Sequence, residues 1–242
     1  MWAKLTGRAF AALDDAATVD DAFAVLVDYA RTLDADLVSY HHLAPPFASG
    51  PREFLILSHG FPDSWVRAYR EERLHEVDPI TAYAAYQTRP VRWSDVPDRV
   101  PLSAAQKAYV ERLYAWLAPG DGKAIPAFGP SSRHGYVGIG RLTPFARWSG
   151  PKLRTVQAVC EAMHLRVCEI LLAGLPQDFE LSERQLALLR AMADGMPDAM
   201  MGGMLNLRPD ALQSAVARLL RIMSVSDRPS AVLRARGLGL LD

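Results

Sequence analysis

The 242-residue sequence lacks an excess of charge of either sign and a pair of cysteines that could form a disulfide. Its 27 Lys and Arg residues balance 27 Asp and Glu residues, so no overall positive field attracts nucleic acid or anionic lipid, and any DNA binding must be local. Cys160 and Cys168 are eight residues apart in a helical pattern. That spacing separates their backbones by about 12 Å, which excludes a bond between them.

Long apolar runs are also missing. No stretch reaches the roughly 20 apolar residues that a membrane span requires. Asp14 and Asp15 interrupt the first residues before any signal-peptide pattern is complete. We therefore expect a cytoplasmic protein that makes no membrane contact.

Helical and strand-like patterns alternate through the first 172 residues. Residues 18–32 form an amphipathic helical pattern behind Thr18 and Asp21, which have the spacing of a capping box. Further helices are predicted at residues 62–74, 79–87, 103–117 and 151–173. Short β-like runs occur at residues 36–42, 53–59, 90–93, 122–128 and 135–142. The pattern predicts an antiparallel sheet of about five strands, on which the broad apolar face of the last helix packs unless it meets a second subunit.

After residue 172 the sequence no longer contains strand-like patterns. Gly174 and Pro176 mark a linker, which we place at residues 173–180 between domains at 1–172 and 181–242. The remainder is helical in pattern, with helices predicted at residues 182–193, 197–205, 209–223 and 228–236. Short helices in so few residues predict a compact bundle that contains a helix-turn-helix.

The segment 60–96 contains an ordered set of unusual residues, namely Phe61-Pro62, Trp65, Tyr69, Asp78-Pro79 and Trp93. Their order and spacing resemble the signature of the LuxR-type quorum-sensing regulators. The C-terminal runs LSERQLALLRAMADG and VSDRPSAVLRARGLGLL resemble the helix-turn-helix domain of the same family. The resemblance covers nearly the whole chain and implies an α+β protein. Its parts would be an N-terminal α/β/α sandwich around the antiparallel sheet and an all-α four-helix domain.

The resemblance implies that the first domain binds an N-acyl-homoserine lactone, and the residue chemistry agrees. Such a ligand has an amide N–H, two carbonyls and an apolar tail, so a buried site needs a strong acceptor, a donor and aromatic walls. By resemblance, Asp78 accepts from the amide, Trp65 donates to the lactone carbonyl, Trp93 packs on the lactone and Tyr69 lines the acyl channel. The candidate ligand-binding residues are Phe61, Trp65, Tyr69, Asp78, Ile80, Trp93, Val110, Leu113, Ile139 and Tyr40. We expect no cofactor besides this effector.

Phe61 departs from the family pattern. The family often has a Tyr there, whose hydroxyl meets the acyl carbonyl of the ligand. That carbonyl then needs water or another donor, such as Tyr40, Ser39 or His42.

Arg141 and the residues of the signature each allow two interpretations. Arg141 faces either the ligand, which would suit an oxidised or acidic acyl group, or the solvent after a shift of one residue in the strand alignment. The aromatic residues of the signature could be ordinary core residues, with Asp78 capping the helix that starts at Pro79. Asp78 can also do both.

The candidate DNA-contacting residues lie on and around the helix predicted at 209–223: Arg208, Gln213, Ser214, Arg218, Arg221 and Arg228. From Pro176 onward the chain has eight Arg, no Lys, and eight Asp and Glu residues, whereas a DNA-reading domain is normally basic. Two interpretations follow. Either a homodimer doubles these contacts and binds double-stranded DNA, or the domain has lost its DNA affinity. In the second case the protein acts by heterodimerising with another LuxR-type regulator or by sequestering the signal.

Two further groups of residues have spacings that are typical of metal or catalytic sites. Cys160, His164 and Cys168 recur at steps of four residues, but positions on one helix cannot close around an ion without a partner. We interpret them as packing residues and expect no metal site. The loop before His134 lacks the G-x-S-x-G elbow, so a lactone hydrolase that uses His134 or Asp78 is a remote alternative, and no catalytic residue is expected.

Overall fold

The computed structural model describes residues 2–43, 55–130, 133–144, 148, 150–173 and 181–241. The chain divides into two compact units. The first comprises Met1–Leu43, Phe54–Gly129 and His134–Ile170, and the second is formed mainly by Leu171–Asp242. The predicted linker lies outside the described residues except for Ala173, so the domain boundaries stay a prediction. No helix in the described part of the chain is long and apolar enough to cross a membrane.

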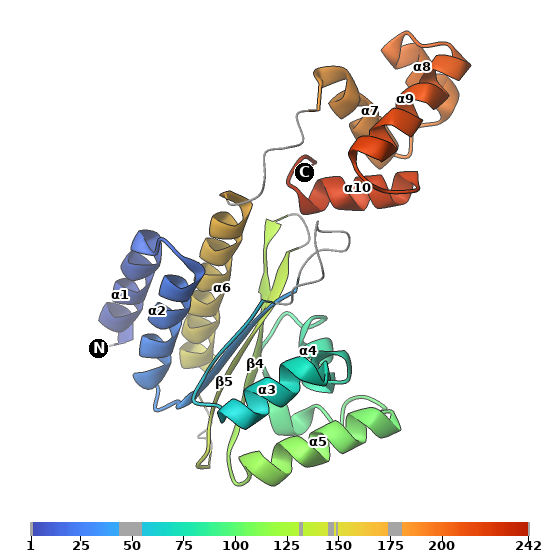
Figure 1. The fold of residues 1–242 in the computed structure, drawn as a ribbon. Coiled ribbons are helices and arrows are strands. Elements are labelled where there is room, and N and C mark those ends of the chain that lie inside the picture. Colours follow the sequence, from blue (N-terminus) through green and yellow to red (C-terminus); the bar gives the residue numbers. More distant parts are fainter. Residues whose placement is uncertain are drawn as a thin grey trace. The chain divides into compact units, whose positions relative to one another are not determined.

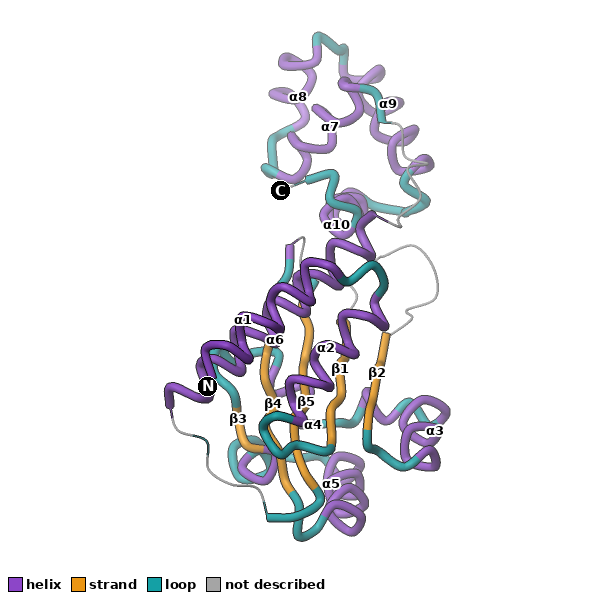
Figure 2. The backbone as a smooth tube through the Cα atoms, turned by 90° about the vertical axis from the view of Figure 1, so that its left-hand side faces the viewer, coloured by secondary structure: helices purple, strands orange, loops and turns teal. Residues whose placement is uncertain are grey.

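A five-stranded sheet forms the centre of the first unit (Figure 1 and Figure 2). The strand order is β2-β1-β5-β4-β3, and each neighbouring pair is antiparallel. The strands are β1 Leu37–Leu43, β2 Leu55–His59, β3 Val91–Arg92, β4 Asp121–Phe128 and β5 His134–Arg141. The predicted antiparallel sheet and the α+β fold class are therefore confirmed.

Helices cover both faces of this sheet (Figure 1). One face carries α1 Trp2–Asp15, α2 Val19–Arg31 and α6 Gly150–Ala173. The other carries α3 Asp63–Glu71, α4 Pro79–Ala84 and α5 Ala104–Leu117, with single 3-10 turns at Leu74–Glu76 and Trp93–Asp95. The sequence prediction missed α1, because its residues were compared only with a signal-peptide pattern.

Three elements are shorter than predicted. Strand β3 stops at Arg92, since Trp93 begins a 3-10 turn. Helix α3 ends at Glu71 and α4 at Ala84, where the predictions extended to residues 74 and 87. The left-handed Arg73, at a φ of 53°, breaks the helical path after α3.

The residues of β1 alternate between two packed faces. Residues 37–42 are all buried. Because successive side chains of a strand point to opposite sides, Ser39 and His41 face α3–α5, whereas Tyr40 and His42 face α6. A single short strand thus contributes polar side chains to two separate places.

The second unit consists of α7 Glu183–Ala193, α8 Asp198–Leu205, α9 Pro209–Ile222 and α10 Arg228–Gly237. These helices match the four predicted ranges closely. Ser182 and Gln185 form a capping box at the start of α7, and the left-handed Asn206 ends α8 before the turn to α9. The apolar faces enclose a core that includes Leu189, Met201 and Leu219.

Candidate ligand-binding pocket

A pocket lies in the first unit between the sheet and the helices α3, α4 and α5. It is lined by a single acid, several rings and a few apolar side chains: Ser39, His41, Ile56, Ser58, Phe61, Trp65, Val66, Tyr69, Asp78, Ile80, Trp93, Tyr109, Leu113 and Tyr136. Seven of the predicted ligand-binding residues are in this lining: Phe61, Trp65, Tyr69, Asp78, Ile80, Trp93 and Leu113. The motif spacing therefore identified one connected surface.

Asp78 is the buried acceptor of the pocket and is 5% exposed. Its Oδ1 accepts the backbone N–H groups of Ile80 at 2.8 Å and Thr81 at 3.4 Å, which caps α4. Its Oδ2 accepts the hydroxyls of Tyr69 at 2.8 Å and Thr81 at 2.9 Å. Pro79 occupies the first helical turn, where its missing N–H costs nothing. The cap and the tyrosine fix the direction in which the carboxylate points.

Burial dominates the electrostatics of the pocket. It raises the pKa of Asp78, and the hydrogen bonds from Tyr69 and Ile80 oppose that rise. Burial, reinforced by the charge of Asp78, also raises the pKa values of Tyr69, Tyr109 and Tyr136 above their usual 10, so their hydroxyls stay protonated. These tyrosines can therefore act as hydrogen-bond donors around a single acid.

His41 adds an uncharged ring to the pocket. Burial, together with the positive charge of His75, lowers the pKa of His41 to about 3. The ring packs edge-on against Tyr69 and Tyr136, at centroid distances of 5.3 Å and 5.0 Å. His41 is thus a neutral imidazole at neutral pH.

The ring of Trp93 lies close to three glycines of β4 and β5. A Cβ atom at Gly122, Gly138 or Gly140 would approach its ring to 2.6, 3.0 or 2.7 Å, closer than real Cβ atoms normally come. Gly122 and Gly140 are cross-strand partners, and Gly138 is two residues along the same face. Because these three positions have no side chain, the indole of Trp93 can pack directly against the backbone of the strands.

Aromatic rings also form the outer wall. Trp65 stacks on Trp116 with an angle of 15° between the rings and 5.8 Å between centroids, and Phe61 lies 5.6 Å from Trp116. The guanidinium of Arg112 sits 5.7 Å from the centroid of the Trp65 ring. Glu72 holds Arg112 through hydrogen bonds of 2.6 and 3.1 Å. The orientation of Trp65 is therefore fixed from two sides.

The sequence analysis missed several lining residues. Tyr109 precedes the predicted Leu113 by one helical turn, so the helical period of α5 contained that signal. Ser39 was named only as a possible donor. His41 and Tyr136 are directly opposite each other on β1 and β5, a pairing that no local pattern specifies.

Three predicted ligand-binding residues do not line the pocket. Tyr40 and Ile139 point to the other face of the sheet, because Tyr40 neighbours Ser39 and His41 along β1, and Ile139 pairs with Val38, which shares the face of Tyr40. Val110 directly follows the lining residue Tyr109 on α5, so its side chain points in a different direction from the helix axis. It lines a separate surface groove. The placement of these three residues at the pocket was wrong.

Arg141 and His42 also lie away from the pocket. Arg141 is two residues beyond Ile139, so it shares the face of Ile139 and points away from the pocket. His42 shares the face of Tyr40. Of the three donors considered as a substitute for the hydroxyl missing at Phe61, Ser39 alone lines the pocket.

The predicted DNA-contacting residues of the second unit fall into two groups. Asp198, at the start of α8, accepts a hydrogen bond of 2.8 Å from Gln213 and forms an ion pair with Arg228 at 2.5 Å. Arg228 in turn lowers the pKa of Asp198. The other four candidates are exposed to solvent, fully or in part: Arg208, Ser214, Arg218 and Arg221.

The first unit is thus a sheet-based domain with a buried, acid-containing aromatic pocket, and the second is a helical bundle that contains a helix-turn-helix. Residues 18–167 match the family model of the autoinducer binding domain, so the chain belongs to that family. It is a LuxR-type quorum-sensing regulator, and the resemblance noted in the sequence is confirmed.

Known relatives agree with this assignment. The chain is 23% identical over 233 residues to the transcriptional activator protein AnoR of Acinetobacter nosocomialis, covering 92% of each chain. It is 22% identical to the transcriptional activator protein RaiR of Rhizobium etli, over 73% of each chain. Because these relatives are transcriptional activators, the expectation of a regulator instead of an enzyme is confirmed.

Solved structures show the same fold. The crystal structure of Escherichia coli SdiA superposes with a TM-score of 0.71 at 15% identity, over 99% of each chain. The N-acylhomoserine lactone dependent LuxR family protein CepR2 of Burkholderia cenocepacia superposes with a TM-score of 0.54 at 20% identity, covering 70% of this chain and 98% of its own. The α+β architecture of this chain is thus shared with SdiA, and its first unit is shared with CepR2.

Proposed function

We propose that this regulator binds an N-acyl-homoserine lactone in the pocket around Asp78 and binds double-stranded DNA as a cytoplasmic homodimer. The observation that carries the ligand assignment is the buried carboxylate of Asp78, oriented by Tyr69 and enclosed by aromatic rings. The structural relative CepR2 is N-acylhomoserine lactone dependent, which supports the same ligand class here.

Each part of such a ligand meets suitable chemistry in the pocket. The amide N–H donates to the carboxylate of Asp78, a charge-assisted bond worth about 1.5–3 kcal/mol. The indole N–H of Trp65 donates to the lactone carbonyl, and the lactone ring packs on Trp93. Ser39 supplies a donor for the acyl carbonyl in place of the hydroxyl that Phe61 lacks. The acyl tail runs along apolar lining residues such as Ile56, Phe61 and Leu113.

Thermal unfolding with a panel of acyl-homoserine lactones tests the ligand assignment. At least one lactone should raise the melting temperature of the full chain, because a ligand that binds only the folded state stabilises it. The Asp78→Asn substitution should leave the fold intact but weaken the affinity roughly 10- to 100-fold. Asp98→Asn, an acid outside the pocket, is the matched control. An equal temperature rise in the Asp78→Asn variant would refute the assigned site.

DNA binding rests on the exposed cations of the second unit. Arg218 and Arg221 lie on α9, the second helix of the helix-turn-helix, and Arg208 precedes it. Sequencing of genomic fragments captured by the full chain should reveal a two-fold symmetric site, since a symmetric dimer reads two half-sites. Arg218→Ala should weaken that binding. Unchanged operator affinity on replacing Arg208, Arg218 and Arg221 together would remove this face from the proposal.

A second candidate function is favoured by the contacts of Asp198. This acid holds Gln213 and Arg228, two of the predicted DNA-contacting residues, and the domain has little net charge. A domain that keeps the fold without DNA affinity would act by heterodimerising with another LuxR-type regulator or by sequestering the lactone. Lactone-stabilised protein that captures no specific DNA would favour this candidate over the first.

A further inference from the structure

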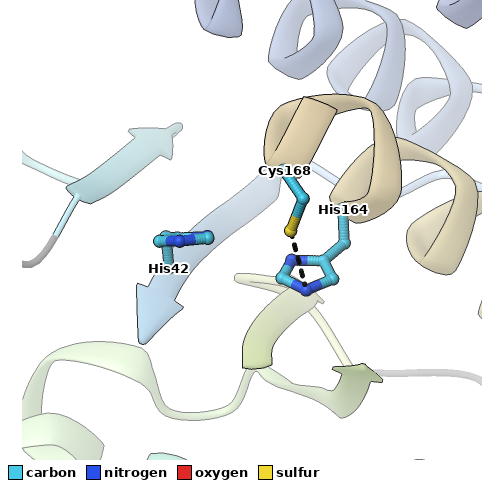
Figure 3. Close-up of side chains that lie close together, drawn as sticks. All are labelled: His42, His164 and Cys168. Atoms are coloured by element: carbon cyan, nitrogen blue, oxygen red, sulfur yellow. Dashed lines mark hydrogen bonds between the residues drawn. The ribbon is translucent and has the colours of Figure 1, made fainter. Parts of the chain in front are cut away.

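A second cluster of polar side chains lies in the first unit, on the face of the sheet opposite the ligand pocket. It consists of His42 on β1 and of His164 and Cys168 on α6, which lie close together (Figure 3). One potential ligand atom from each residue lies within 4.8 Å of those of the other two. All three side chains are buried, and His164 and Cys168 are fully shielded from solvent.

Tyr40 orients both imidazoles of this cluster. Its hydroxyl lies 3.1 Å from Nδ1 of His42 and 2.8 Å from Nδ1 of His164. In each ring the remaining nitrogen is Nε2, and that of His164 lies 3.5 Å from the sulfur of Cys168. A hydrogen bond at one imidazole nitrogen commonly fixes the ring for ligation through the other.

The backbone of β5 makes room for the ring of His164. A Cβ atom at Gly135 would lie 2.5 Å from Nδ1 of His164, so this ring position requires a glycine there. Gly135 pairs with His42 across the two strands. The strand, the helix and the glycine thus converge on the same three side chains.

We propose that His42, His164 and Cys168 form a binding site for monovalent copper, Cu⁺. Metal–nitrogen and metal–sulfur bonds of about 2.0–2.3 Å place the donors of a trigonal site roughly 3.5–4 Å apart. The sulfur of Cys168 and Nε2 of His164 already have that separation. The ligand atoms of the three residues all lie within 4.8 Å of one another, so the widest pair needs a contraction of at most about 1 Å, which a small rotation of a histidine side chain supplies. Two imidazoles and one thiolate form a trigonal donor set that copper accepts.

The net charge of the metal–ligand complex favours Cu⁺ over Zn²⁺ at this buried site. One thiolate and two neutral imidazoles around Cu⁺ give a complex with no net charge, whereas the same ligands around Zn²⁺ leave one positive charge in the protein interior. An uncompensated buried charge is costly. Soft thiolate donors also favour Cu⁺.

Metal binding releases one proton. The sulfur of Cys168 exchanges its S–H bond for an S–Cu bond, and the proton passes to bulk water. The copper stays monovalent throughout, so no oxidant or reductant is needed. The phenol oxygen of Tyr40 can accept from both Nδ1–H groups when both Nε2 atoms bind the ion.

Anaerobic competition with a coloured Cu⁺ chelator, bicinchoninate, tests the site on the purified full chain. The wild-type protein should withdraw one Cu⁺ per chain from the chelator. The Cys168→Ser variant should bind Cu⁺ at least about tenfold more weakly, because it loses the thiolate. Cys160→Ser is the matched control and should bind as the wild type does, since Cys160 is an equally buried cysteine of the same helix outside the cluster.

A second measurement covers the case in which Cys168→Ser does not fold. X-ray absorption at the copper edge of the wild-type protein should show one sulfur and two nitrogen neighbours. Absence of stoichiometric Cu⁺ binding by the wild type would overturn the proposal. Equal loss of binding in the Cys160→Ser variant, or binding of Zn²⁺ in preference to Cu⁺, would also overturn it.

Discussion

The two faces of the central sheet carry different chemistry, although the same strands build both. On one face Ser39 and His41 meet the ring of Trp93 and the carboxylate of Asp78 in the ligand pocket. On the other face Tyr40 and His42 meet the helix α6. Neighbouring residues in β1 therefore belong to separate sites, with a single sheet between them.

Because the sheet separates the two sites, each can be perturbed without the other. Each face has its own glycine that makes room for a ring, Gly140 under Trp93 and Gly135 beside His164. Each face also has a tyrosine that orients the polar groups. Matched substitutions on the two faces then distinguish a role in ligand binding from a general contribution to stability.

The glycines give the largest expected effect. Gly140→Ala places a methyl group 2.7 Å from both the Trp93 ring and the backbone oxygen of Asp121, and Gly135→Ala places one 2.5 Å from His164. Overpacking of this kind costs about 1–3 kcal/mol, so chemical denaturation should show a similar loss of unfolding free energy in both variants. Lactone affinity should fall in Gly140→Ala alone. Equal lactone affinity in the two variants would mean that the position of Trp93 does not matter to the ligand.

The tyrosines give the next effect. Tyr69→Phe removes the hydroxyl that donates to Asp78, and Tyr40→Phe removes the one shared by His42 and His164. Each should cost roughly 1–1.5 kcal/mol of unfolding free energy, because a buried hydrogen bond is lost. In lactone titrations only Tyr69→Phe should shift the affinity. A shift of the same size in Tyr40→Phe would show that the sheet transmits changes between its faces.

The sequence predicted the helical half of the pocket well, because local spacing contains that information. Trp65 and Tyr69 are four residues apart, which places them on one face of a helix. Asp78 directly before Pro79 is a typical start of a helix. The strand-borne half was predicted poorly. Residues 37–42 of β1 are buried on both faces, so no alternation of polar and apolar residues reveals which side chains face the pocket.

The second cluster was beyond any local pattern. Helical spacing suggested Cys160, His164 and Cys168 as a group, whereas the described structure combines His164 and Cys168 with His42 from a distant strand. The residues His42 and His164 are brought together by the packing of α6 on β1. Side-chain spacing within one element cannot show such a contact, which depends on the whole fold.

The smallest expected effect comes from His41 and has a defined pH dependence. The folded pKa of about 3 lies below the ordinary value of 6.5, so the unfolded chain takes up a proton that the folded chain excludes. This contribution to stability is fully present above pH 6.5 and is lost as the pH falls toward 3. At pH 6 the loss is about 0.8 kcal/mol.

The His41→Leu substitution isolates this contribution, since it keeps a buried side chain at the position and removes the titrating group. Denaturant unfolding at pH 7.5 and pH 6 should show a smaller loss of stability in the variant than in the wild type, by about 0.8 kcal/mol. The other histidines are common to both proteins, and those that do not interact with His41 cancel in the difference. An identical loss in both proteins would mean that burial in the pocket does not lower the pKa of His41.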